Sequence, residues 1–174
     1  RYLAFARRAA ITGPAPRVAL NSPSGVDKLG YPAALRGDET VQGIRSVWML
    51  QTAADGLRYA VVVSYPLAAG NLENEATTFA IAIVSNRDLS RQGGADPVAL
   101  GKQRNAQALQ KGYECLFAAH VSWWKPFWSI SDVQYADAGV QRQYVLDKYF
   151  YGSASRPGAP PMPLQGVWTA DEGG

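Results

Sequence analysis

The sequence predicts an α+β protein, with an antiparallel β-sandwich part followed by two helices and an extended proline-rich segment. Between residues 44 and 84, apolar residues alternate with others and turn-forming residues separate the runs, which indicates strands. From residue 96 onward, apolar residues recur every three or four positions, as they do on one face of a helix. Residues 155–168 contain four prolines and are typical of an extended segment close to polyproline geometry.

Three strands are predicted in the first half of the chain. They are residues 44–51, 57–65 and 77–84. Asp55 and Gly56 separate the first two strands, and an Asp-Gly pair suits the positive φ angles of a hairpin turn. Because Ala60 and Val62 make the second face of the middle strand apolar as well, we expect packing partners on both sides of it. Strands joined by turns without intervening helices favour an antiparallel sandwich layer.

The first predicted helix begins at Asp96 and Pro97, residue types that suit an N-cap and the first helical position. We expect it to run to about Trp124, because Pro126 disfavours helical backbone in the residue before it.

Two glycines, Gly101 and Gly112, either weaken this helix or allow another element to pack closely. The second helix is expected from Asp137, a suitable N-cap, to about Tyr151, with Gly152 as its C-cap.

The composition is that of an ordinary globular protein, with 174 residues, 47% hydrophobic and 18% charged. The formal net charge is +3, but the basic residues are scattered, so no nucleic-acid partner is predicted. No apolar run approaches the roughly 20 residues of a membrane-spanning helix, and no membrane partner is predicted. The first residues contain neither an initiator methionine nor a signal-peptide pattern, so we expect the chain to be part of a longer protein.

No catalytic residue, cofactor or metal site is predicted within the chain. Cys115 and His120 are its only cysteine and histidine, and their spacing does not place them on one helical face, which argues against a zinc site or a catalytic pair. We interpret His120 as a partly buried packing residue, since no carboxylate partner for acid–base chemistry is identifiable. Asp171 and Glu172 are adjacent and are interpreted as solvated, not as the opposed carboxylates of a glycosidase.

Tryptophan offers a flat apolar face that suits sugar rings. Trp123, Trp124 and Trp128 lie within six residues, but their helical spacing favours core packing over sugar binding. Trp168 lies in the proline-rich segment close to Gln165, and loop aromatics beside amides are common in carbohydrate sites. Trp168 and Gln165 are therefore the predicted substrate-binding residues, although a purely structural role for them stays open.

Three runs in the second half share an order and a spacing that are uncommon in proteins. They are WWKPFWS at residues 123–129, YFYGSASRPG at 149–158 and LQGVW at 164–168. In these runs the chain resembles glycoside hydrolase family 95, the α-L-fucosidases and α-L-galactosidases, in which a Y-L-x-x-x-S-R-P-G run leads into L-Q-G-x-W. The resemblance covers roughly residues 108–170.

The resemblance implies a large enzyme with an N-terminal β-sandwich, a helical linker and an (α/α)6 catalytic barrel. On that mapping, residues 1–90 are part of the sandwich domain, residues 91–130 are the helical linker and residues 131–174 begin the barrel. The rest of the barrel would be a structural partner and would supply the catalytic residues, which lie beyond this chain. The implied activity is general acid/base hydrolysis of α-linked sugars in oligosaccharides or polysaccharides.

The resemblance also bears on the sugar that the enzyme recognises and on the compartment in which it works. Thr169 stands where typical α-L-fucosidases carry an asparagine, so a substrate other than α-L-fucose stays open. Enzymes of this type are usually exported, and we expect a secreted or periplasmic protein.

Two other interpretations remain. The chain could be a non-catalytic, glycan-binding β-sandwich with a helical docking tail, or part of a related barrel enzyme such as a disaccharide phosphorylase. The LQGVW run after the proline-rich segment argues against the phosphorylase. A self-contained glycan-binding module is not expected to expose the aromatic run near residues 123–128, because large apolar patches seek partners.

Overall fold

A computed structural model describes residues 7–10, 18–20, 29–67, 76–89 and 96–155. The chain divides into two compact units, Arg1–Phe117 and Ala118–Gly174. The described part combines an antiparallel sheet with helices, so the predicted α+β class is confirmed.

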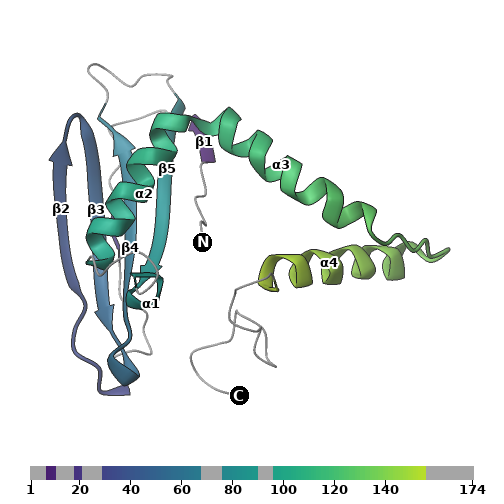
Figure 1. Cartoon of the computed structure of the whole chain (residues 1–174), viewed down its shortest axis with the longest axis horizontal. Coiled ribbons are helices and arrows are strands. Elements are labelled where there is room, and N and C mark those ends of the chain that lie inside the picture. Colours follow the sequence, from purple (N-terminus) through teal and green to yellow (C-terminus); the bar gives the residue numbers. More distant parts are fainter. Residues whose placement is uncertain (1–6, 11–17, 21–28, 68–75, 90–95, 156–174) are drawn as a thin grey trace. The chain divides into compact units, whose positions relative to one another are not determined.

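The first unit is built on an antiparallel sheet with the strand order β1-β5-β4-β3-β2 (Figure 1). The strands are β1 (Arg7–Ala10), β2 (Leu35–Val41), β3 (Ile44–Thr52), β4 (Arg58–Pro66) and β5 (Ala76–Ser85). Strands β2 to β5 are neighbours in both the sequence and the sheet, so they form a meander. The three predicted strands correspond to β3, β4 and β5 and are confirmed.

Turn chemistry sets the register of the meander. Between β3 and β4, Asp55 and Gly56 have φ angles of 55° and 68°, as the Asp-Gly pair predicted. Between β2 and β3, Gln42 and Gly43 also have positive φ angles, 50° and 76°, which a two-residue hairpin loop requires.

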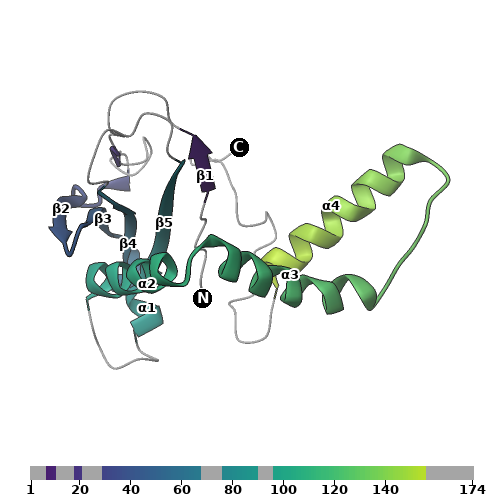
Figure 2. The same ribbon diagram turned by 90° about the horizontal axis from the view of Figure 1, so that it is seen from above.

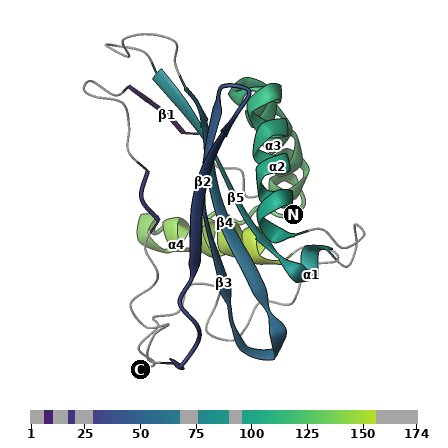
Figure 3. The same cartoon turned by 90° about the vertical axis from the view of Figure 1, so that its left-hand side faces the viewer.

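Helix α2 (Pro97–Lys111) covers one face of this sheet (Figures 1 and 3). Val98 of α2 belongs to a buried cluster with Leu50, Ala60 and Val62, and Leu100 of α2 packs with Ala82 and Val84 of β5. The core of the first unit therefore lies between α2 and strands β3, β4 and β5. One sheet is present among the described residues, so the second layer of a sandwich is not established.

Close approach of α2 to the sheet depends on Gly101. A Cβ atom at this position would lie 2.5 Å from Cγ2 of Val62, which is far inside van der Waals contact. Of the two roles considered for Gly101, close packing is the one that the structure shows. Asp96 caps α2 as predicted, because its carboxylate accepts a hydrogen bond from the Ala99 backbone N–H at 3.3 Å.

The prediction of one helix from residue 96 to residue 124 is wrong, because the segment forms α2 and a separate helix, α3 (Tyr113–Ser129). Gly112 lies between them with φ 77° and ψ 160°, outside the helical region and in a conformation that is open almost only to glycine. Pro126 does not stop α3, which continues to Ser129. Pro126 lies in the last turn of the helix; it cannot donate to the Ser122 carbonyl one turn earlier, but the residues after it remain helical up to Ser129.

Helix α4 (Ala138–Ala154) begins as predicted at Asp137, whose carboxylate accepts the Val140 N–H at 2.9 Å. Its predicted end is wrong, because Gly152 lies inside the helix and Ser155 is the C-cap. A Cβ atom at Gly152 would lie 2.7 Å from Cζ of Phe127 and 2.8 Å from Cζ3 of Trp124. This glycine therefore serves close packing between helices and not helix termination.

Candidate functional site

Five aromatic residues form a continuous cluster between α3 and α4, here called the aromatic cluster. It contains Trp123, Trp124, Phe127 and Trp128 of α3 and Tyr149 of α4. The first four lie at relative positions 0, 1, 4 and 5, so successive helical turns bring them to one side of α3. The cluster therefore follows from the local sequence as soon as the α3 helix forms.

Trp124 is the centre of the aromatic cluster. Its ring lies 4.9 Å from Trp123 and 5.2 Å from Phe127, both in edge-to-face geometry. It stacks on Trp128 at 5.8 Å and on Tyr149 of α4 at 5.3 Å. These separations lie in the range of favourable aromatic pairs, each contributing about 0.5–1.5 kcal/mol beyond area burial.

Lys148 of α4 contacts the C-terminal end of α3. Its ammonium donates hydrogen bonds to the carbonyl oxygens of Trp128, at 3.1 Å, and of Ser131. The same ammonium lies 5.1 Å from the ring centroid of Trp128 and 5.8 Å from that of Phe127, a cation–π arrangement. A cation at the C-terminus of a helix is also favoured by the helix dipole.

The C-terminal part of α4 contacts the C-terminal half of α3, and Figure 2 shows the two helices joined by the segment that connects them. Tyr149 and Gly152 contact the end of α3, whereas the start of α4 contacts the connecting segment. In that segment the Tyr135 N–H donates to Oε1 of Gln141 at 2.9 Å, and the Tyr135 and Tyr144 rings lie 5.7 Å apart. The chain therefore leaves α4 beside the aromatic cluster.

Much of this aromatic surface faces solvent. No residue of α3 is buried, and Gly152 is the only buried residue of α4. The exposed fraction is 42% for Trp123 and 45% for Tyr149, and the next two residues, Phe150 and Tyr151, are more exposed still. The tryptophans contact one another, but none of them is buried, so the predicted core packing is not found among the described residues. Chemically, such a face can stack on apolar rings or cations.

The predicted substrate-binding residues Gln165 and Trp168 lie outside the described residues. His120 is exposed on α3, with its ring centroid 6.0 Å from that of Trp124, so its predicted partial burial is wrong. It lies one turn before the aromatic cluster, on the part of α3 that α4 does not cover. Cys115 is also exposed. Among the residues that the structure describes, no histidine, cysteine and carboxylate side chains gather in a way that could hold a metal ion.

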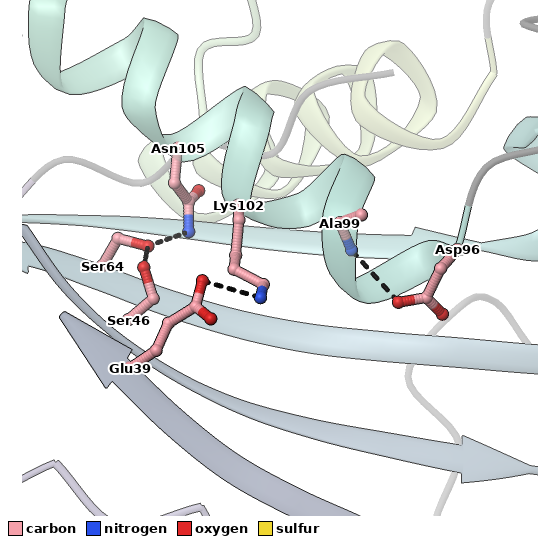
Figure 4. A network of polar contacts seen from close by, with 7 residues as sticks. All are labelled: Glu39, Ser46, Ser64, Asp96, Ala99, Lys102 and Asn105. Carbon is pink, nitrogen blue, oxygen red and sulfur yellow. Dashed lines mark hydrogen bonds and ion pairs between the residues drawn. The ribbon is translucent and has the colours of Figure 1, made fainter. Parts of the chain in front are cut away.

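A buried polar network in the first unit was not predicted (Figure 4). Asn105 of α2 donates hydrogen bonds to the Val62 carbonyl at 2.9 Å and to Oγ of Ser64 at 3.1 Å. The Ser64 and Ser46 hydroxyls lie 2.8 Å apart. The available signal was spacing, since Val98, Gly101 and Asn105 recur at intervals of three and four residues and so share the face of α2 that packs on the sheet.

A carboxylate next to the sheet has a perturbed pKa. Asp88 lies in α1 (Asn86–Leu89), and its Oδ2 accepts hydrogen bonds from the backbone N–H and the hydroxyl of Ser85, at 2.9 and 3.0 Å. Partial burial opposes ionisation, but these hydrogen bonds and the positive charge of Arg104 outweigh it and lower the pKa of Asp88 below its usual 3.8. The arrangement is a capping interaction and holds the turn after β5.

The chain matches no protein-family model, no curated protein and no solved structure. None of the described helices combines the length and the apolar character that crossing a membrane requires.

Proposed function

We propose that this chain is part of a glycoside hydrolase similar to family 95, which cleaves α-linked sugars from oligosaccharides or polysaccharides. The observation that carries the proposal is the series WWKPFWS, YFYGSASRPG and LQGVW in the second half of the sequence. The element order supports it, because an antiparallel sheet precedes the helices, as it does in an enzyme with an N-terminal sandwich and a helical barrel.

The exposed side chains of α3 and α4 support a continuation into more helices. Two helices bury only the faces that they turn toward each other, and an all-helical barrel covers the remaining apolar faces with further helices. Large apolar residues remain exposed in α4, namely Val140, Val145, Leu146, Tyr149, Phe150 and Tyr151. A surface of this kind favours an incomplete helical layer over a self-contained binding module.

In this proposal residues 1–90 belong to a sandwich domain, residues 91–130 to a helical linker and residues 131–174 to the start of an (α/α)6 barrel. Gln165 and Trp168 border the sugar site. The catalytic carboxylates belong to the rest of the barrel, and the whole enzyme is secreted or periplasmic.

The test begins with the mass of the native protein in its source cells, compared with the 18.8 kDa of this chain. We expect a mass several times larger, and we expect the full-length protein to hydrolyse nitrophenyl α-glycosides. Gln165→Ala should lower kcat/KM, whereas Gln110→Ala, at an exposed position of α2, should leave it unchanged.

Two results would contradict the enzyme proposal. One is a native mass near that of this chain. The other is a full-length protein that binds glycans on an array but turns over no α-glycoside, which would favour the non-catalytic glycan-binding module.

A further inference from the structure

Strand β2 lies at one edge of the sheet in the first unit. It is the last strand in the order β1-β5-β4-β3-β2, so among the described strands only β3 pairs with it (Figure 1). Its residues are exposed except for the partly buried Gly37, and the strand contains no proline. Because an edge strand presents unpaired backbone N–H and C=O groups, a further strand can add to it.

The hairpin between β2 and β3 determines which backbone groups of β2 point outward. Its two-residue loop is closed by the pair Val41 and Ile44, which such a turn joins by a hydrogen bond. The Gly43 carbonyl accepts the N–H of Leu67, directly after β4, at 2.7 Å, so the groups of Ile44 point the other way, toward β2. Hydrogen-bonded pairs alternate along an antiparallel ladder. The residues of β2 whose backbone groups point away from β3 are therefore Arg36, Asp38 and Thr40.

The charges of β2 limit how a second copy of the strand can pair with it. A twofold axis through the sheet pairs the two copies of β2 antiparallel, and the outward-pointing residues form the hydrogen-bonded pairs. With Asp38 or Glu39 on the axis, that carboxylate faces its own copy, and like charges directly opposite destabilise a sheet. With Gly37 on the axis, Arg36 lies opposite Asp38 of the second copy, and Asp38 lies opposite Arg36. This register is charge-complementary on both sides of the axis.

Asp38 can accept this second partner while it keeps its first. Its Oδ2 atom accepts a hydrogen bond from the Arg45 guanidinium at 2.9 Å, and 54% of the Asp38 side chain is exposed. A carboxylate has acceptor positions on both of its oxygens. A guanidinium from a second copy can therefore join the existing ion pair.

Gly37 suits the centre of such an interface. A Cβ atom at Gly37 would lie 2.4 Å from Cζ2 of Trp48, so the indole ring lies over this glycine. With Gly37 on the axis, the two glycines form a non-hydrogen-bonded pair, in which the Cα atoms approach to about 4.5 Å. The two Trp48 indoles then lie about one strand spacing apart, roughly 5 Å, which is in the range of favourable aromatic pairs.

We propose that two copies of this chain pair through β2, antiparallel, with Gly37 on the twofold axis and Arg36 opposite Asp38. The sheets of the two copies then form one continuous antiparallel sheet. Because the paired edge is short, the interface belongs to the small class that associates weakly, and we expect a dissociation constant in the micromolar range. This inference does not rest on the proposed enzymatic function, since it uses only β2 and the residues next to it.

Analytical ultracentrifugation of the whole chain at micromolar concentrations tests the pairing. We expect the weight-average mass to rise with concentration from 18.8 kDa toward twice that value. Arg36→Asp places acidic residues opposite each other and Asp38→Arg places basic residues opposite each other, so each variant alone should stay a monomer. An equimolar mixture of the two variants restores arginine opposite aspartate in both pairs and should associate again.

The matched control is Lys111→Asp, which makes the same change of charge as Arg36→Asp at an exposed position of α2. It should associate like the unaltered chain. The inference is overturned if the unaltered chain stays a monomer over this concentration range. It is also overturned if both charge variants associate as the unaltered chain does, because the contact would then lie elsewhere, such as on the aromatic cluster.

Disulfide cross-linking tests the register. In a Cys115→Ser background, we expect Leu35→Cys combined with Glu39→Cys to give a disulfide-linked dimer on a non-reducing gel, because these positions oppose each other between the copies as a non-hydrogen-bonded pair. Within one chain they lie about 13 Å apart along β2, too far for a disulfide. Each single cysteine variant has no cysteine opposite it and should stay a monomer. Single variants that cross-link as readily as the double variant would overturn the proposed register.

Discussion

Asn105 is an amide enclosed between α2 and the sheet, with 1% of its surface exposed. Its two N–H groups satisfy the Val62 carbonyl and the Ser64 hydroxyl, and Ser64 in turn contacts Ser46. A buried amide without its hydrogen-bond partners would be energetically costly. Because these hydrogen bonds form in only one placement of α2, the network fixes the position of the helix along the sheet. The nearby Lys102–Glu39 ion pair, at 2.8 Å, is partly exposed and contributes about 1 kcal/mol at most.

Asn105→Ala should therefore destabilise the fold by about 1–3 kcal/mol, because it leaves two buried groups without their donor. Urea unfolding followed by circular dichroism measures the loss. Gln103→Ala, at an exposed position of the same helix, is the matched control and should change stability by less than about 0.5 kcal/mol. If both substitutions lowered stability equally, the buried Asn105 amide would not have the structural role proposed for it.

Asp88 gives a prediction about pH. Its pKa is lower in the folded chain than its ordinary value of 3.8, so its ionised form stabilises the fold above that value. The stabilisation is lost as the pH falls through the lowered folded-state pKa. We expect Asp88→Asn to reduce stability at neutral pH and to weaken the acid-induced loss of stability below about pH 4. Urea midpoints measured from neutral to acidic pH provide the test, with Asp132→Asn, in an exposed loop, as control.

Residue-level features were predictable where their cause is local. Asp96 and Asp137 were recognised as N-caps because a cap accepts a backbone N–H only three residues away. Asn105 was not recognised, because its acceptors lie 41 and 43 residues away in the sequence. The exposure of His120 depends in the same way on where α4 crosses α3, which helical spacing does not reveal.

At the scale of elements, three helical-pattern glycines have three different outcomes. Gly101 stays inside α2 and lets Val62 approach, Gly112 separates α2 from α3, and Gly152 stays inside α4 beneath two aromatic rings. The sequence offered helix weakening or close packing for Gly101 and Gly112 and a C-cap for Gly152, but it did not distinguish which glycine takes which role. What distinguishes them is the backbone angle of Gly112 and the tertiary neighbours of the other two.

Gly101→Ala tests the closeness of α2 to the sheet. Alanine is the better helix former by about 1 kcal/mol, but overpacking against Val62 costs about 1–3 kcal/mol. We expect a net loss of stability, measured as a lower urea midpoint. A Val62→Ala background removes the 2.5 Å contact and leaves the Cβ of residue 62 at 3.2 Å, so Gly101→Ala should cost less stability there than in the unaltered chain. A gain of stability in the unaltered background would show that α2 does not pack as closely as the structure indicates.

At the scale of the whole molecule, the two units differ in how much they bury. The first unit has buried clusters between α2 and the sheet, whereas Gly152 is the only buried residue of α3 and α4. Amide protection follows local burial and local unfolding. We expect hydrogen exchange measured by mass spectrometry to be slow in β3, β4, β5 and α2, and faster in α3 and α4. Exchange as slow in α4 as in β4 would contradict this.

The predictable part of the molecule is the part with strong periodicity. The α+β class, the hairpin at Asp55-Gly56 and strand β5 followed from alternation and turn residues. The edge strand β2 has no such pattern, since its residues are mostly exposed. The candidate site was foreseen only as a run of tryptophans, because contacts such as Trp124 with Tyr149 join two helices separated by a connecting segment.

The meander has a consequence for how the protein is made. Strands β2 to β5 and helix α2 form a contiguous stretch of sequence that ends at Lys111, before the first residue of α3. Chains grow on the ribosome at about 5–20 residues per second, and N-terminal units fold first. The sheet can therefore close over α2 several seconds before the aromatic helices are complete. Surfaces prone to aggregation then emerge attached to a folded unit instead of an unfolded chain.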